Sequence, residues 1–355
     1  IIPTECDAYG DWLSAFAILS LDRLRRQALA RALVSALSPG ASASDRLDDV
    51  LQGRFVIRRL VACGDVTRLN ADVLALGDGD HLASLVSPYP GPVNKGYEYP
   101  PLNKPHVVQQ FLTVGGGATL PGDHRFLIVD PDFLFVRPLP LTSSAGRLLG
   151  ATGSPYSATY NIGFDWFLGK PEVASLCGEP CARWLAREQE RAAAADPSAT
   201  RLQVQAKVRS MGVRGFDVGC PYFLSVADAR DITPHWLHLT EAAVQLGDPS
   251  SAWGVPGGWI VEMYAYAMGA MLADRPHTTR LGLMASVWEG PEWQDVVSDV
   301  SHPPPILHYC QAYNVTTTAD KYLALAPSLP EADPSLVMGA DGRERAAFYF
   351  QKHDW

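Results

Sequence analysis

The chain lacks the features of several large classes of protein. Of its 355 residues, 29 are Lys or Arg and 38 are Asp or Glu, which gives a formal net charge of −9. A nucleic-acid-binding surface needs clustered positive charge, so this balance argues against DNA or RNA as a partner. No stretch approaches about 18 consecutive apolar residues, so the sequence as given predicts no membrane span. It starts at Ile1 without a Met, from which we expect a targeting segment or membrane anchor upstream.

Two common nucleotide-binding fingerprints are also missing. The sequence contains neither the G-x-G-x-x-G pattern of dinucleotide-binding folds nor the G-x-x-x-x-G-K-[ST] pattern of a P-loop. If the protein binds a nucleotide, its phosphates must therefore be held by a metal ion, by one or two basic side chains or by backbone amides.

The six cysteines are spread along the chain, unlike the dense disulfide framework of small secreted domains. Cys177 and Cys181 lack further Cys or His partners at the spacing of a zinc site. Cys6 and Cys63 both end apolar runs and could meet at the ends of neighbouring strands, either as a disulfide or as two buried thiols.

What the chain does contain is an alternation of strand-like and helix-like segments. Strands are expected at 1–4, 55–62, 126–129, 222–224 and 306–310, and helices at 9–37, 105–112, 227–246 and 256–271. This order predicts an α/β fold in which a mainly parallel central sheet is flanked by helices. In such folds ligands bind at the carboxyl ends of the strands.

Asp130-Pro131-Asp132 stands at such an end, directly after the apolar run Phe126–Val129. Two carboxylates one residue apart can hold a hard divalent cation, and that cation can bridge the two phosphates of a nucleotide. The pattern favours an enzyme that uses a nucleotide diphosphate as its leaving group. The alternative is an ordinary surface turn, because Asp and Pro are common turn residues.

Two further segments carry candidate functional residues. Asn103-Lys104-Pro105 is expected to open a helix, with Asn103 as its N-cap and Lys104 near an anion-attracting helix start; the alternative is a solvated surface lysine. On a later helix, Trp259, Glu262 and Tyr266 share one face, where the carboxylate could orient a hydroxyl acceptor. The alternative there is core packing around a hydrogen-bonded Glu.

These blocks together resemble the plant and algal peptidyl hydroxyproline O-arabinosyltransferases and the related peptidyl-serine O-galactosyltransferases. The resemblance keeps the order of its blocks over most of the chain. The matching blocks are Thr4-Glu5-Cys6-Asp7 with Asp11-Trp12, Arg59-Leu60, Leu102–Pro105, Asp130-Pro131-Asp132, Gly219-Cys220-Pro221, Gly258–Tyr266 and Leu307-His308-Tyr309.

The resemblance implies a GT-A type glycosyltransferase fold and a Mn²⁺-dependent enzyme of the Golgi lumen. It implies one catalytic domain over 1–355, with a donor-binding part at about 1–140, an acceptor-binding part at about 141–320 and a tail at about 321–355. The donor would be UDP-β-L-arabinofuranose and the acceptor 4-hydroxyproline in a Pro-rich, extensin-type cell-wall glycoprotein, with retention of the anomeric configuration.

The same resemblance implies roles for individual residues. Asp130 and Asp132 would bind the metal, and His308 would be its third protein ligand, although a lone His in an apolar strand is more often a core residue. Glu262 would orient the acceptor or stabilise the cationic sugar, with Asp217 as the second choice. The remaining donor-binding candidates are Thr4, Glu5, Cys6, Arg59, Asn103 and Lys104. An aromatic groove for an extended polyproline II peptide would contain Trp253, Trp259, Tyr266 and the tyrosines of 88–101.

Two alternatives stay open. Asn103-Lys104-Pro105 is closer to the serine galactosyltransferase branch, whereas Pro131 is closer to the arabinosyltransferase branch, so the chain could use UDP-galactose instead. It could also be a catalytically silent peptide-binding module on the same scaffold. A metal-dependent phosphoesterase is disfavoured, because the sequence offers no further cluster of carboxylates or histidines near Asp130.

Overall fold

A computed structural model gives the fold of the chain. It describes residues 1–5, 8–36, 56–63, 65, 81–86, 89, 100–139, 141, 149–159, single positions between 179 and 200, 215, 216, 218–245, 261–280, 282–285, 304–308, 313–316 and 349–352. These residues form a mixed α/β protein with several sheets that contain parallel strands. The α/β class expected from the sequence is therefore confirmed.

One sheet is parallel throughout. Its strands are β1 (Ile2–Glu5), β2 (Ile57–Ala62) and β3 (His81–Val86), in the order β1-β2-β3. The register pairs Thr4 with Val61 and Glu5 with Ala62, so β1 and β2 end at the same level. The apolar residues of β2, Ile57 and Leu60–Ala62, are buried, as is Arg59 between them.

A second sheet is mixed. Its strands are β4 (Arg125–Ile128), β6 (Tyr156–Thr159), β7 (Val218–Ser225) and β8 (Thr278–Arg280), in the order β4-β7-β6-β8. The central strand β7 runs antiparallel to both β4 and β6, and only β6 and β8 are parallel. The expectation of a mainly parallel sheet thus holds for the first sheet and not for the second.

Backbone hydrogen bonds connect the two sheets. The Ile1 nitrogen donates to the Leu127 carbonyl oxygen at 2.7 Å, and the Val129 N–H donates to the Ile1 carbonyl oxygen at 3.0 Å. This is the bonding pattern of neighbouring parallel strands, so β4 lies beside β1 and points the same way. From β1 the chain continues to β2 on one side and later returns to β4 on the other. The carboxyl ends of β1 and β4 therefore form a topological switch point.

A small third sheet follows β4. It consists of β5 (Phe133–Phe135), β9 (Met284–Ala285) and β10 (Ile306–His308), with β10 antiparallel to β5 and parallel to β9. Phe133 and Phe135 are fully buried and hold β5 against the core. This pairing brings a segment from late in the chain next to the residues that follow β4.

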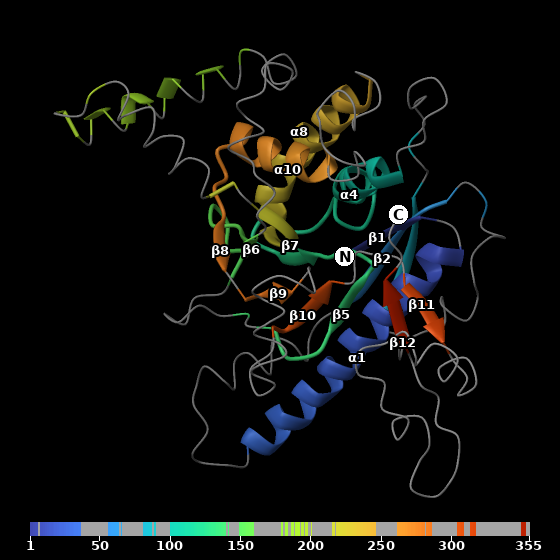
Figure 1. The fold of residues 1–355 in the computed structure, drawn as a ribbon. Helices are drawn as coiled ribbons and strands as arrows, with labels where there is room; N and C mark the ends of the chain where they lie inside the picture. The colour runs from blue at the N-terminus through green and yellow to red at the C-terminus, as the bar shows by residue number, and fades with distance from the viewer. Residues whose placement is uncertain are drawn as a thin grey trace, which may run out of the picture. The chain divides into compact units, whose positions relative to one another are not determined.

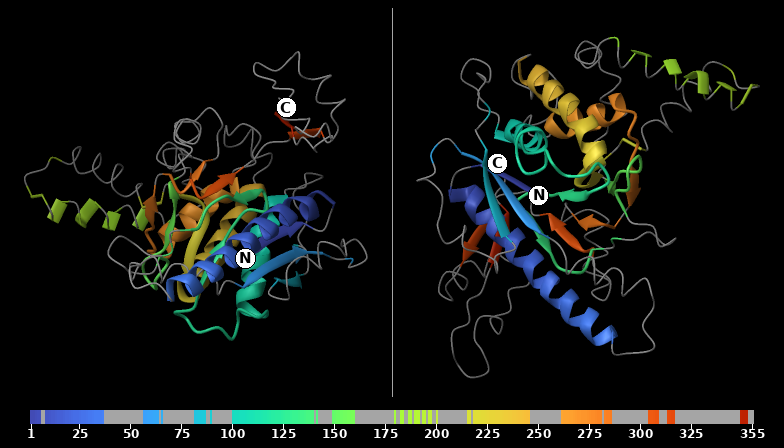
Figure 2. Two further views of the ribbon diagram at one scale, coloured as in Figure 1. Left: turned by 90° about the horizontal axis from the view of Figure 1, so that it is seen from below. Right: turned by 180° about the vertical axis from the view of Figure 1, so that it is seen from behind.

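Helices cover both sides of the strands β1 and β2, as the views in Figure 1 and Figure 2 agree. The long helix α1 (Ala8–Ala36) lies on one side, where the Ser20 hydroxyl accepts a 3.1 Å hydrogen bond from the Phe135 N–H of β5. On the other side lie α4 (Asn103–Thr113), which follows a 3₁₀ turn, η3 (Pro100–Leu102), and the helices α8 (Val226–Gln245) and α10 (Val261–Leu272).

Helices α8 and α10 pack closely because of Gly269. A Cβ atom at this position would lie 2.9 Å from the Trp236 backbone nitrogen and 3.3 Å from the Ile232 carbonyl oxygen. Nearby, the Tyr222 and Tyr266 rings stack with their centroids 3.6 Å apart. Nearly every residue of α10 is buried, which explains its almost unbroken apolar sequence.

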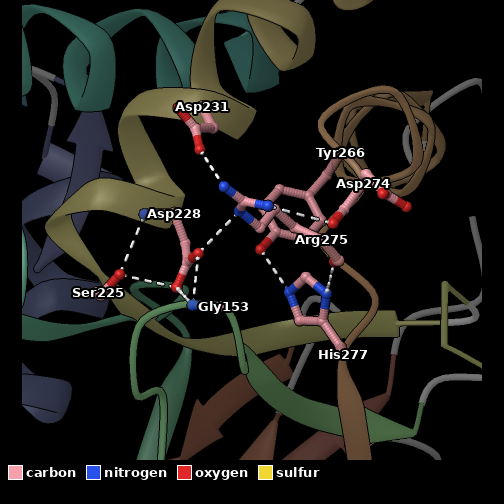
Figure 3. Close-up of polar contacts among 8 residues, drawn as sticks. All are labelled: Gly153, Ser225, Asp228, Asp231, Tyr266, Asp274, Arg275 and His277. Carbon is pink, nitrogen blue, oxygen red and sulfur yellow. Dashed lines mark hydrogen bonds and ion pairs between the residues drawn. The ribbon is translucent and has the colours of Figure 1, made fainter.

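Asp228, at the start of α8, joins three segments of the chain (Figure 3). Its carboxylate accepts hydrogen bonds from the Ser225 hydroxyl at 2.7 Å and from the Gly153 N–H at 3.0 Å, and it forms an ion pair with Arg275 at 2.9 Å. The Ser225 oxygen in turn accepts from the Asp228 N–H at 3.0 Å and so caps α8. Arg275 also contacts Asp231 at 2.6 Å.

The chain separates into two compact units, Ile1–His308 and Tyr309–Trp355. In the second unit, β11 (Tyr313–Thr316) and β12 (Tyr349–Lys352) form an antiparallel pair. The sequence-based division placed the start of a C-terminal tail slightly later, at about 321. Within the described residues, no helix has both the length and the apolar character needed to cross a bilayer.

Candidate metal centre and buried charge cluster

One strand pairing brings His308 to Asp130 and Asp132. Asp130 and Asp132 follow the end of β4, and β5 starts immediately after them. The register of β5 and β10 places His308 opposite Phe133, next to Asp132 in the chain. The His308 and Phe133 rings meet edge to face with centroids 4.8 Å apart, which fixes the position of the imidazole.

The three side chains have the geometry of a metal-binding group. One ligand atom from each of Asp130, Asp132 and His308 lies within 4.8 Å of the other two. The His308 Nε2 atom lies 3.2 Å from Asp132 Oδ2. The second Asp132 oxygen, Oδ1, is buried and has no hydrogen-bond partner among the described residues. A buried carboxylate oxygen without a partner is costly, and a bound cation would satisfy it.

Asp132 and His308 favour each other's charged forms. Burial alone would raise the pKa of the Asp132 carboxyl, but the neighbouring imidazolium outweighs it and lowers that pKa. Burial alone would lower the pKa of His308, but Asp132 outweighs it and raises that pKa. Each group therefore stabilises the charged form of the other, and a metal ion can bind His308 only through an unprotonated ring nitrogen.

Lys104 contacts two carboxylates from different parts of the fold. Its Nζ atom lies 2.5 Å from Asp130 Oδ1 and 2.5 Å from Glu262 Oε1. Burial alone would lower the pKa of the ammonium, but Asp130 and Glu262 outweigh it and raise the pKa well above its usual value. Lys104 is therefore charged and is not the solvated surface lysine of the alternative interpretation.

Glu262 lies in the first turn of α10 and is buried. Burial raises the pKa of this carboxyl, against the opposing effect of the Lys104 ammonium. The Trp236 indole N–H of α8 donates to the Glu262 carbonyl oxygen at 2.8 Å and fixes this turn of the helix. Trp236 is not among the site residues predicted from the sequence, because nothing in the sequence of α8 distinguishes it from a core residue.

The net charge of the cluster suits a divalent cation. Asp130, Asp132 and Glu262 supply three carboxylates, whereas Lys104 supplies one positive charge and His308 is neutral when it acts as a ligand. A cation with two charges would balance this buried group. Two carboxylates and an imidazole are a ligand set that several divalent metal ions accept.

The carboxyl end of the first sheet contributes a second set of predicted donor-binding residues. Arg59 on β2 is fully buried, and its Nε atom donates to the Thr4 hydroxyl of β1 at 3.1 Å. The backbone of Glu5 ends β1, but its side chain lies outside the described residues, as does Cys6. Cys63, at the end of β2, forms a disulfide, which excludes the free thiol for this residue.

The structure corrects the expected role of Asn103. Leu102 is the N-cap of α4 and makes no capping hydrogen bond through its side chain. Asn103 is instead the first residue of the helix, and its side-chain oxygen accepts a 3.0 Å hydrogen bond from the Tyr89 N–H. The amide side chain thus holds the preceding loop against the helix, a long-range contact that the local sequence does not indicate.

The Tyr266 side chain makes its contacts in the aromatic core. Its ring is fully buried against Tyr222, and its hydroxyl lies 2.8 Å from His277 Nε2. The His277 Nδ1 atom lies 3.0 Å from the Arg275 carbonyl oxygen, which can only accept. Nδ1 therefore carries the proton, and the Tyr266 hydroxyl donates to Nε2. The interior position of Tyr266 supports the core-packing interpretation and gives no support to contact with an acceptor.

Three further predicted residues, Asp217, Trp253 and Trp259, lie outside the described residues. Of the predicted site residues that are described, five form one cluster: Lys104, Asp130, Asp132, Glu262 and His308. Comparison with protein-family models, with curated proteins and with solved structures finds no match to this chain. The fold and the site define an α/β protein with a buried acidic centre that is suited to a divalent cation.

Proposed function

We propose that this protein is a metal-dependent glycosyltransferase that moves L-arabinofuranose from UDP-β-L-arabinofuranose to 4-hydroxyproline in a Pro-rich glycoprotein of the Golgi lumen. The observation that carries the proposal is the convergence of Asp130, Asp132 and His308 behind β4. His308 meets the two aspartates although it lies far from them in the sequence, which a chance surface turn does not explain.

The position of this group in the sheet supports a fold of the GT-A type. In α/β sheets, ligands bind outside the carboxyl ends of the strands at a topological switch point. The switch point here lies between β1 and β4, and Asp130 follows β4 directly. The Arg59–Thr4 contact lies near the carboxyl end of the neighbouring strand pair.

Each residue of the cluster has a role in this proposal. Asp130, Asp132 and His308 would hold a Mn²⁺ ion, which when bound neutralises the charge that develops on the nucleotide diphosphate. The Lys104 ammonium has three N–H donors, one of which donates to Glu262 Oε1, while its contact with Asp130 is an ion pair. In the proposal, a remaining N–H would donate to a phosphate oxygen of the sugar donor. Glu262 would orient the acceptor hydroxyl or stabilise the positive charge on the sugar.

Retention of the anomeric configuration follows from attack on the leaving-group face. The acceptor hydroxyl would approach the anomeric carbon from the side that the diphosphate leaves, and a phosphate oxygen would take the hydroxyl proton. The C1–O bond to the diphosphate breaks as the new glycosidic bond forms, so the protein needs no covalent intermediate.

The decisive experiment measures sugar transfer with Mn²⁺ present. UDP-arabinofuranose and UDP-galactose are each offered with a hydroxyproline-rich peptide and with a serine peptide. We expect transfer from the arabinofuranose donor to the hydroxyproline peptide. Turnover of the galactose donor alone would favour the peptidyl-serine galactosyltransferase, to which Asn103-Lys104-Pro105 is also similar. Peptide binding without turnover of either donor would favour a silent peptide-binding module.

A matched pair of variants tests the metal site within the same assay. Asp132→Asn keeps the shape of the side chain but removes its charge, and it should reduce transfer by roughly a hundredfold or more. Asp123→Asn makes the same change at an exposed position outside the cluster and should have no effect. Equal activity of the two variants would rule out a metal site at Asp132.

A further inference from the structure

Lys104 contacts two buried carboxylates, Asp130 and Glu262, which have different roles in the proposed function. Lys104 lies in the first turn of α4, Asp130 follows β4, and Glu262 lies in the first turn of α10. The ammonium lies at the same distance, 2.5 Å, from an oxygen of each carboxylate. Asp130 belongs to the candidate metal group, whereas Glu262 does not. The ammonium therefore connects the metal group to a carboxylate outside it.

The Lys104 ammonium and a bound metal ion would both contact the Asp130 carboxylate. A cation bound to Asp130, Asp132 and His308 would lie close to Lys104, because the same Asp130 carboxylate contacts both. Repulsion between two such charges is strong in a buried site, where water screens them poorly. Glu262 offers Lys104 a second partner already in contact, so the ammonium can give up Asp130 without becoming unpaired.

We infer that Lys104 is a positioning residue that competes with the divalent cation for Asp130. When the cation binds, the Lys104 ammonium leaves Asp130 and pairs with Glu262. This inference rests on the proposed metal site. In the metal-free protein, Lys104 holds Asp130 in place and limits the affinity of the site for cations. In the metal-bound protein, the ammonium pairs with Glu262 and keeps that carboxylate ionised.

An ordinary structural salt bridge gives a different expectation. If Lys104 and Glu262 only filled buried space, removing both charges together would leave the net charge near the metal unchanged, and affinity would stay the same. If Lys104 competes for Asp130, removing both charges would free Asp130 and tighten binding. The double variant Lys104→Met with Glu262→Gln therefore separates the two roles, and it leaves neither member of the Lys104–Glu262 pair as an unpaired buried charge.

The experiment measures Mn²⁺ binding by isothermal titration calorimetry on the purified, folded chain near neutral pH. The double variant should bind Mn²⁺ roughly tenfold tighter than the unaltered protein. Glu262→Gln alone should bind Mn²⁺ roughly tenfold more weakly, because Lys104 then has only Asp130 as a partner. A double variant that binds no tighter than the unaltered protein would overturn the inference.

A third variant distinguishes the failure of this inference from the failure of the proposed function. Asp132→Asn should abolish Mn²⁺ binding. If this variant binds Mn²⁺ as well as the unaltered protein does, or if neither protein binds Mn²⁺, the assignment of the metal site is wrong. The proposed competition at Asp130 is then refuted as well. If Asp132→Asn loses binding while the double variant is unchanged, the metal site stands and the role of Lys104 is refuted.

Discussion

Arg275 forms ion pairs with two aspartates whose burial differs, so replacing each aspartate with Ala tests how far burial decides the strength of an ion pair (Figure 3). Asp228 and Asp231 both lie in the first turns of α8 and contact the Arg275 guanidinium at 2.9 and 2.6 Å. The Asp228 side chain is fully buried, whereas that of Asp231 is 48% exposed. Distance alone would rank the Asp231 contact as the stronger one.

Burial reverses this ranking. The Asp228 carboxylate also accepts hydrogen bonds from the Ser225 hydroxyl and the Gly153 N–H, and Asp228→Ala leaves both donors without this acceptor. Breaking a buried, hydrogen-bonded ion pair destabilises a protein by about 3–5 kcal/mol. The contact with Asp231 is screened by water, and exposed pairs of this kind contribute about 0–1 kcal/mol. We therefore expect Asp228→Ala to be the more destabilising by at least about 2 kcal/mol.

Urea denaturation followed by circular dichroism measures both free energies of unfolding. The comparison is controlled internally, because the two variants lose the same side chain and the same partner arginine. Similar losses in the two variants, or a larger loss for Asp231→Ala, would refute the argument that burial sets the strength of these contacts. The result also bears on the fold, because Asp228 joins α8 to the segments before β6 and after α10.

Two further predictions concern stability. Gly269→Ala should destabilise the protein by about 1–2 kcal/mol, because the cost of overpacking against the Trp236 backbone exceeds the roughly 1 kcal/mol by which Ala is more favourable than Gly in a helix. Urea denaturation measures the change. A variant as stable as the unaltered protein, or more stable, would contradict the close packing of α8 and α10. Burial lowers the pKa of His277 from 6.5 to about 3, despite the opposing hydrogen bond to the Arg275 carbonyl. Below pH 6.5 the unfolded chain therefore binds a proton at His277 that the native chain does not bind. His277 has no effect on the free energy of unfolding above pH 6.5 and lowers it progressively towards pH 3, by about 1.4 kcal/mol per pH unit. In His277→Gln the free energy of unfolding should change less between these pH values, and an unchanged slope would contradict the assignment.

The elements with strong apolar patterns were predictable from the sequence. Helix α1 was expected at 9–37 and spans Ala8–Ala36, and α8 was expected at 227–246 and spans Val226–Gln245. The strands β2 and β4 were likewise expected within one or two residues of their observed bounds. In each case burial imposes a long apolar run or a regular apolar face, which is a local signal.

Other elements carry no such signal. Strand β6 has the sequence Tyr-Ser-Ala-Thr, and it is a strand because β7 and β8 supply hydrogen-bond partners on both edges. Strand β3 was not expected either, and its pairing with β2 defines it. The N-cap assigned to Asn103 failed for a related reason, since its amide bonds to the Tyr89 backbone rather than to its own helix.

The sequence by itself determined the α/β class and the position of the two carboxylates Asp130 and Asp132 after the end of a buried strand. Both follow from local patterns: alternating apolar segments and charged residues at a strand end. Only the tertiary structure decided what these carboxylates contact. The pairing of β5 with β10 brings His308 to Asp132, and the packing of α4 and α10 against α8 places Lys104 between Asp130 and Glu262. Such contacts depend on segments distant in the sequence, so no spacing of residues along the chain could specify them.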